Sequence, residues 1–186
     1  MRLRLLMLGV ALVLAVVAGW AASRSNDNDD TARLDTRVTF EQPSIETNAA
    51  VEGDPLPDAT VQNLAGDDIT IASLVGRPMV INIWGSTCGP CKQELPAFAA
   101  VHLQYAARVR FVGIDYLPAS DREEAFARDK GVQYELFYDG DGEFVNGAGV
   151  AAFPVTLFVD ASGRIVRQTG QLDEADLIAI IESDLL

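Results

Sequence analysis

The sequence has few residues that bind metals or nucleic acids. It contains two cysteines and one histidine, and only 14 lysines and arginines stand against 27 aspartates and glutamates. These three ligands are one fewer than a structural zinc site needs, and an iron–sulfur cluster usually takes four thiolates. With a net charge of −13 and no basic run beyond the first few residues, the chain lacks a face that could neutralise phosphates. The composition therefore excludes these metal centres and indicates that nucleic acid is not a partner.

The length predicts one globular domain with additional segments. The chain has 186 residues, which fits one domain of about 150 residues with extra chain. Because 49% of the residues are hydrophobic, the domain can bury a core. Two cysteines cannot form the disulfide framework of a small secreted protein. The expectation is one acidic domain with a single cysteine pair.

The first 22 residues are predicted to be a signal-anchor. Arg2 and Arg4 precede an uncharged, mostly apolar run at 5–22, which is long enough to cross a bilayer as a helix. Small residues such as Gly19 and Ala21 have a cleavage-like spacing, so a cleaved signal peptide is the alternative. We favour the uncleaved anchor, which makes a single-pass membrane protein with the domain outside the cytoplasm. Cleavage would make the protein secreted.

A polar segment at 23–52 follows the apolar run. Its Ser, Asn, Asp, Thr and Arg residues offer too little apolar surface to offset the entropy of ordering. We expect a flexible linker, either a tether that lifts the domain off the membrane or a leader without a mechanical role.

Residues 53–186 alternate between short apolar runs and amphipathic stretches. The apolar runs predict strands and the amphipathic stretches predict helices, one of them begun by the capping-box pattern at 120–123. Strands that alternate with helices and end in a hairpin predict an α/β domain, with a central mixed sheet flanked by helices on both faces. The expected strands are 59–64, 69–71, 78–84, 109–115, 133–138, 154–159 and 164–168, and the expected helices are 92–108, 121–130 and 173–185.

The cysteines form the motif Cys88-Gly89-Pro90-Cys91 between a predicted buried strand and a helix. At the start of a helix, free N–H groups and the helix dipole favour a thiolate, so Cys88 is the expected nucleophile. Cys91, one turn further, can attack a mixed disulfide on Cys88 and release the partner. Pro90 fits the first turn, where a missing N–H has no cost.

Other uses of the pair are weaker. As a structural staple, so short a loop stabilises the fold by only about 2 kcal/mol. Covalent haem attachment needs a histidine at the position of Lys92. In a cysteine protease His102 would be the base, but it lies 14 residues, or about 21 Å along a helix, from Cys88. We therefore expect His102 to be an ordinary residue of a helix surface.

Two segments resemble the thioredoxin superfamily, specifically its membrane-tethered TlpA/ResA-like branch. Residues 80–96 read Val-Ile-Asn-Ile-Trp-Gly-Ser-Thr-Cys-Gly-Pro-Cys-Lys-Gln-Glu-Leu-Pro and are similar to the active-site strand and helix. Residues 152–160 read Ala-Phe-Pro-Val-Thr-Leu-Phe-Val-Asp and resemble the loop with a cis-proline that faces the disulfide. The resemblance covers about residues 54–186, and it implies a thioredoxin fold with an N-terminal β-hairpin extension.

The resemblance also implies roles for single residues. Cys88 is the attacking thiol, Cys91 the resolving thiol, and Phe153 offers backbone hydrogen bonds to a docked substrate strand. Glu94 matches an acidic residue of this branch and either transfers a proton or compensates the helix dipole. The other positions expected to contact substrate are Trp84, Thr87, Gly89, Pro90 and the cis residue Pro154.

Two residues depart from the family pattern. Asn82 stands where cytoplasmic thioredoxins have a buried aspartate, so no carboxylate at that position can take the proton of the resolving thiol. Thr87 stands where a second tryptophan is common. Peroxiredoxins are a third interpretation, but the loop around their peroxidatic cysteine is rich in Pro and Thr, unlike this one.

The predicted function is that of a thiol–disulfide oxidoreductase that reduces extracytoplasmic protein disulfides, with cytochrome c maturation as one setting. Its cycle would need no metal and no organic cofactor. Its partners would be protein thiols or disulfides and a membrane or thioredoxin-like redox partner that regenerates it. The alternatives are a disulfide-forming oxidant and a non-catalytic thioredoxin-fold module for binding or assembly.

Overall fold

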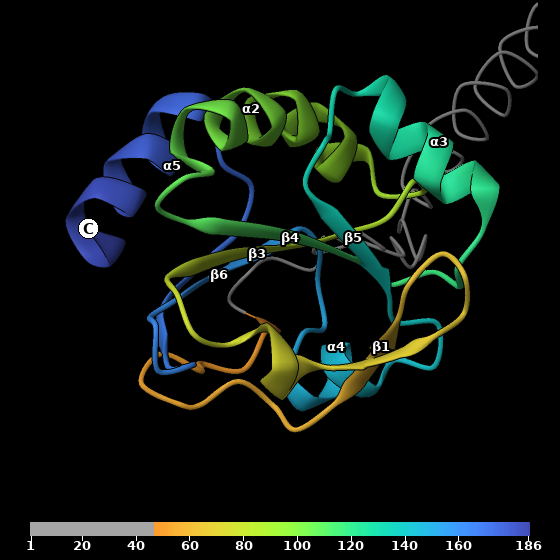
Figure 1. Ribbon diagram of the computed structural model, residues 1–186, viewed down its shortest axis with the longest axis horizontal. Coiled ribbons are helices and arrows are strands. Elements are labelled where there is room, and N and C mark those ends of the chain that lie inside the picture. Colours follow the sequence, from red (N-terminus) through yellow and green to blue (C-terminus); the bar gives the residue numbers. More distant parts are fainter. Residues whose placement is uncertain (1–46) are drawn as a thin grey trace, which may run out of the picture. The chain divides into compact units, whose positions relative to one another are not determined.

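A seven-stranded mixed sheet forms the centre of the domain in the computed structural model, which describes residues 47–186 (Figure 1). The strand order is β2-β1-β5-β4-β3-β6-β7. The strands are β1 (Thr60–Gln62), β2 (Asp68–Thr70), β3 (Met79–Trp84), β4 (Arg110–Asp115), β5 (Glu135–Tyr138), β6 (Val155–Val159) and β7 (Ile165–Thr169). The predicted anchor at 1–22 and most of the predicted linker at 23–52 lie outside the described residues. The described end of that linker is packed on the domain rather than flexible: Asn48 accepts a hydrogen bond from the Ala152 N–H, and Val51 is buried in the core. Within 47–186, no helix is long and apolar enough to cross a membrane.

Strand β3 is the central strand that leads to the cysteine pair. All six of its residues are buried, which explains the nearly continuous apolar run in the sequence. It pairs in parallel with β4, where Trp84 is opposite Asp115, and antiparallel with β6, where Ile83 is opposite Val155. The C-terminal end of β3 therefore lies beside the end of β4 and the start of β6.

Alternate residues of β3 face two separate hydrophobic cores. Val80 and Trp84 pack with α2 (Gly89–Tyr105), α3 (Asp121–Asp129) and α5 (Glu174–Ile180), which cover one face of the sheet (Figure 1). Ile81 and Ile83 pack with the short helix α4 (Glu143–Gly147) and the 3-10 turn η2 (Ile71–Leu74) on the other face. Helices thus flank the sheet on both sides, as the sequence predicts.

Three details of the helices differ from the expectation. Helix α2 begins at Gly89 rather than at Lys92, so Cys88 is its N-cap and Cys91 lies in its first turn. The last helix ends at Ile180 and continues as a π-helical turn, η3 (Ile181–Leu185). Helix α4 was not predicted because it has only five residues; the buried carboxylate of Asp139 accepts hydrogen bonds from the N–H groups at its start.

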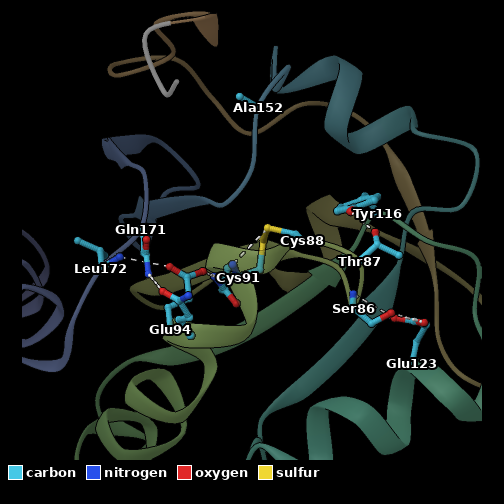
Figure 2. Close-up of a disulfide and its surroundings, with 12 residues drawn as sticks. Ser86, Thr87, Cys88, Cys91, Glu94, Tyr116, Glu123, Ala152, Gln171 and Leu172 are labelled. Carbon is cyan, nitrogen blue, oxygen red and sulfur yellow. Dashed lines mark hydrogen bonds between the residues drawn. A yellow bond between two sulfur atoms is a disulfide. The ribbon is translucent and has the colours of Figure 1, made fainter. Parts of the chain in front are cut away.

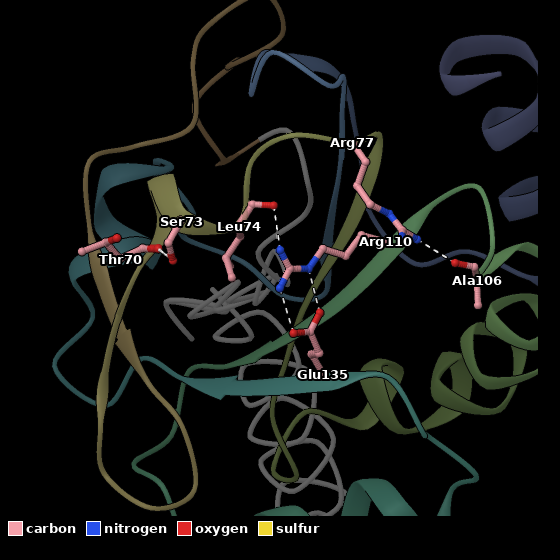
Figure 3. Close-up of polar contacts among 7 residues, drawn as sticks. All are labelled: Thr70, Ser73, Leu74, Arg77, Ala106, Arg110 and Glu135. Atoms are coloured by element: carbon pink, nitrogen blue, oxygen red, sulfur yellow. Dashed lines mark hydrogen bonds and ion pairs between the residues drawn. The ribbon is translucent and has the colours of Figure 1, made fainter.

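The end of the sheet away from the cysteines is held by arginine contacts (Figure 3). Arg110, the first residue of β4, donates two hydrogen bonds to the carboxylate of Glu135, at 2.7 and 2.8 Å, and one to the carbonyl of Leu74. Arg77 donates to the carbonyl of Ala106, just beyond α2. These bonds join η2, β4, β5 and α2, and so fix the frame from which β3 and α2 extend.

Candidate active site

A disulfide joins Cys88 and Cys91 at the start of α2 (Figure 2). The Cα atoms are 5.3 Å apart, and Cys88 is the N-cap: its sulfur accepts a hydrogen bond from the Cys91 N–H at 3.2 Å. Cys88 is half-buried beside the exposed Gly89 and Pro90, whereas Cys91 is fully buried. An incoming sulfur can therefore reach Cys88 but not Cys91.

Thr87 belongs to a surface that the sequence did not reveal. Its hydroxyl forms a 2.7 Å hydrogen bond with the Tyr116 hydroxyl, and the Tyr116 ring stacks on Phe153 with ring centres 4.2 Å apart. These contacts link Thr87, the residue before Cys88, through Tyr116 to Phe153, the residue before Pro154. A side chain at Gly85 would place a Cβ only 2.5 Å from the Tyr116 ring, so glycine is required there.

The Phe153–Pro154 peptide bond is cis, as the resemblance implies. Pro154 directly precedes β6, whose residue Val155 is opposite Ile83, so this bond lies beside the end of β3 from which the cysteine loop begins. Pro154 is buried and Phe153 is half-buried. Phe153 is thus the member of the pair whose side chain a docked chain can reach.

Glu94 is a buried carboxyl on the second turn of α2, near the disulfide (Figure 2). Only 1% of its surface is exposed. It accepts a 2.7 Å hydrogen bond from Asn82 Nδ2 and a 3.2 Å bond from the Leu172 N–H. Burial raises the pKa of Glu94 to about 7, although both hydrogen bonds favour the charged form. Such a carboxyl can accept or release a proton near neutral pH.

The structure gives Asn82 and Trp84 roles that differ from those expected from the sequence. Asn82 removes a carboxylate from β3, but its amide orients the carboxylate of Glu94 instead. Trp84 was expected to contact substrate, yet it is fully buried and stacks on Phe126 with ring centres 6.1 Å apart. Its indole supports the site from beneath rather than offering surface to a substrate.

His102 is not the ordinary surface residue that was expected. It is half-buried, and its ring packs edge-on against Phe111 and Tyr134, with ring centres 5.4 and 5.5 Å away. Burial lowers the pKa of His102. Its partners are aromatic residues of the core, well along α2 from the cysteines, so it has no part in the disulfide site.

Comparison with known proteins supplies the family. A model described as the AhpC/TSA family matches residues 52–168, which is more than half of the chain. The chain belongs to the AhpC/TSA family. In Bacillus subtilis, the thioredoxin-like protein YneN is 28% identical over 118 residues, covering 61% of this chain and 68% of YneN. The thiol-disulfide oxidoreductase ResA of Geobacillus thermodenitrificans is 25% identical over 140 residues, covering 74% of this chain and 80% of ResA.

Solved structures agree with this assignment of the AhpC/TSA-family chain. A putative protein disulfide isomerase from Bacteroides thetaiotaomicron has a TM-score of 0.64 and 28% identity, covering 75% of this chain and 92% of that one. A secreted Mycobacterium tuberculosis disulfide oxidoreductase has a TM-score of 0.58 and 25% identity, covering 68% and 96%. With the thioredoxin fold and the paired cysteines, these relatives make this AhpC/TSA-family protein a thioredoxin-like thiol–disulfide oxidoreductase, similar to ResA.

Proposed function

We propose that this oxidoreductase reduces protein disulfides outside the cytoplasm through a mixed disulfide on Cys88. The observation that carries the proposal is the difference between the two sulfurs. Cys88 is reachable and its sulfur accepts the Cys91 N–H, whereas Cys91 is sealed beneath it. The first is suited to attack a substrate, and the second to attack only a sulfur already bound to Cys88.

The reaction balances as a two-electron exchange. The Cys88 thiolate attacks one sulfur of a substrate disulfide; the substrate S–S bond breaks, and its other sulfur leaves as a thiolate that takes up a proton. The Cys91 thiolate then attacks the Cys88 sulfur and releases the second substrate thiol. The substrate is reduced, and the enzyme is left with the Cys88–Cys91 disulfide seen in the structure.

Glu94 is the proposed proton acceptor for Cys91. The resolving thiol must lose its proton in an apolar setting before it can attack, and Asn82 has no basic group to receive it. Glu94 is buried near the disulfide and has a pKa of about 7, so it is a base at and above neutral pH. A group that served only to balance the helix dipole would not need to be buried.

Reduction is the proposed direction, with apocytochrome c as one kind of client. The Gly89-Pro90 dipeptide between the cysteines is like that of reducing thioredoxins, and ResA is among the similar oxidoreductases. Extracytoplasmic compartments are oxidising, so electrons must come from a membrane carrier or another thioredoxin-like protein.

A membrane-anchored location is proposed from the N-terminal sequence. Arg2 and Arg4 before the apolar run at 5–22 favour a cytoplasmic N-terminus and an external domain. The similar Mycobacterium tuberculosis oxidoreductase is described as secreted, which agrees with a site of action outside the cytoplasm.

The direction predicts the potential. Equilibration with glutathione redox buffers, followed by quantifying reduced protein, should give a value nearer about −270 mV than the about −120 mV of a strong oxidant. A potential above about −180 mV would make the protein an oxidase or isomerase and contradict the reductant.

The proton-acceptor role predicts the effect of Glu94→Gln. The amide keeps the size, and its single oxygen can replace one of the two carboxylate oxygens that accept from Asn82 and Leu172, but it cannot take a proton. Resolution of a mixed disulfide by Cys91 should slow more than about tenfold, and the rise in rate as the pH passes through about 7 should disappear. Stopped-flow measurement between pH 6 and 9 tests this, with Asp129→Asn on the exposed side of α3 as control. An unaltered profile in Glu94→Gln would reduce Glu94 to a structural role.

Trapping tests the mixed-disulfide mechanism. Cys91→Ala, expressed in the native compartment, should accumulate proteins linked to Cys88 that a reductant releases, because no second thiol can resolve them. Mass spectrometry identifies these substrates, and Cys88→Ala is the matched control. Adducts on Cys88→Ala but not on Cys91→Ala would reverse the roles of the cysteines. Adducts on neither variant would favour a non-catalytic binding module.

The location predicts where the protein fractionates. It should be found in the membrane fraction, and protease added outside intact cells should release the domain by cutting within 23–52. A soluble form that begins near Ala22 would show a cleaved signal peptide instead.

A further inference from the structure

The carboxylate of Glu123 reaches from α3 to the loop before the disulfide (Figure 2). Ser86 Oγ donates a 2.7 Å hydrogen bond to Glu123 Oε1, and the Ser86 N–H donates a 3.2 Å bond to Oε2. Both residues are buried, with Glu123 only 5% exposed. Both oxygens of one carboxylate are therefore used to hold a single residue, two positions before Cys88.

This contact departs from the usual role of the residue. In a capping box the glutamate at the third position of the helix bonds back to the N–H of the N-cap residue. The Ser120 half of the box is present, because its hydroxyl accepts a hydrogen bond from the Glu123 N–H at 3.3 Å. Within the described residues, however, the Glu123 carboxylate bonds to Ser86 and not to the Ser120 N–H. The N-terminus of α3 therefore has only the Ser120 half of the capping box, because the Glu123 carboxylate bonds to the cysteine loop.

Asp115 completes the arrangement from the end of β4. It is fully buried, and its Oδ1 accepts the Leu117 N–H at 2.9 Å. No donor in the described part of the chain reaches its Oδ2. The Asp115 carboxyl interacts with that of Glu123 instead. Burial, and next the contact with Glu123, raise the pKa of Asp115 to about 8. Asp115 therefore keeps its proton at neutral pH and can donate it to Glu123.

Few other ionisable groups face this carboxyl pair. Tyr138 on β5 lies near Asp115, but its hydroxyl donates to Glu124 at 2.6 Å. Glu124 in turn pairs with Arg128. Tyr138, Glu124 and Arg128 thus bond to one another, and the hydrogen bonds of the Glu123 carboxylate go to Ser86.

We propose that Glu123 is a positioning residue that sets the acidity of the Cys88 thiol. Ser86 lies inside a turn closed by the bond from the Cys88 N–H to the Gly85 carbonyl, at 3.1 Å. This turn places the Cys88 sulfur where it accepts the Cys91 N–H. Without the bonds from Ser86 to Glu123, the turn relaxes and the thiolate loses its donor. The proposal rests on the function above, in which Cys88 is the nucleophile.

A pair of variants with equal charge separates positioning from electrostatics. Glu123→Ala and Glu123→Gln both remove the negative charge, but the Gln amide oxygen can still accept from Ser86. In the reduced protein, the rate of Cys88 alkylation by iodoacetamide is measured against pH by peptide mass spectrometry. The midpoint should be higher in Glu123→Ala than in Glu123→Gln by about half a pH unit or more. Equal midpoints, or a lower midpoint in Glu123→Ala, would overturn the proposal.

Two controls separate an effect on Cys88 from a loss of folding. Thermal melts of the oxidised variants report folding, and if Glu123→Ala does not fold, Ser86→Ala is compared with the wild type. Ser86→Ala removes the 2.7 Å bond and keeps the charge, so its midpoint should also rise; an unchanged midpoint would overturn the proposal. Faster labelling of Cys91 than Cys88 in the wild type would refute the proposed function itself. A nucleophilic Cys88 with equal midpoints in the variants would refute only the role of Glu123.

Discussion

The hydrogen bond from the Cys91 N–H to the Cys88 sulfur connects the fold to the chemistry. It exists because Cys88 occupies the N-cap of α2, where backbone N–H groups have no partner within the helix. That position is set in turn by β3, which is buried along its whole length and delivers the chain to the end of the sheet in one orientation. The sheet, the helix and the cysteine spacing therefore act together, and a shift in any of them would move the sulfur away from its donor.

Buried carboxyl groups lie on both sides of this bond, and each side is proposed to act on a different cysteine. Glu94, within α2, is near the buried sulfur and is oriented by Asn82. Glu123 and Asp115 lie on the side of the reachable sulfur, and act on it through Ser86. Because burial raises the pKa of both Glu94 and Asp115, each can hold a proton that an exposed carboxyl would have lost. In the proposed mechanism Glu94 exchanges a proton with Cys91, whereas Asp115 keeps its proton beside Glu123.

The sequence predicts those parts of the site that depend on neighbours along the chain. The buried run of β3 and the cysteine spacing are local patterns, and they locate the disulfide; the cis bond before β6 was expected only from the family resemblance. Tyr116 and Glu123 were missed as site residues because their partners Thr87 and Ser86 are 29 and 37 residues away. Glu123 even satisfies a local pattern, the capping box, that explains it without the loop. Only the folded sheet, which sets the end of β4 beside the end of β3, shows the other use.

The β1–β2 hairpin has a consequence for self-association. It meets β5 at Gln62 and Tyr138 and so moves the edge of the sheet away from the apolar residues of β5. The new edge is β2, a strand of three residues that begins with Asp68. A short, charged edge is a poor template for strands of other molecules. The extension therefore protects the sheet against edge-to-edge aggregation.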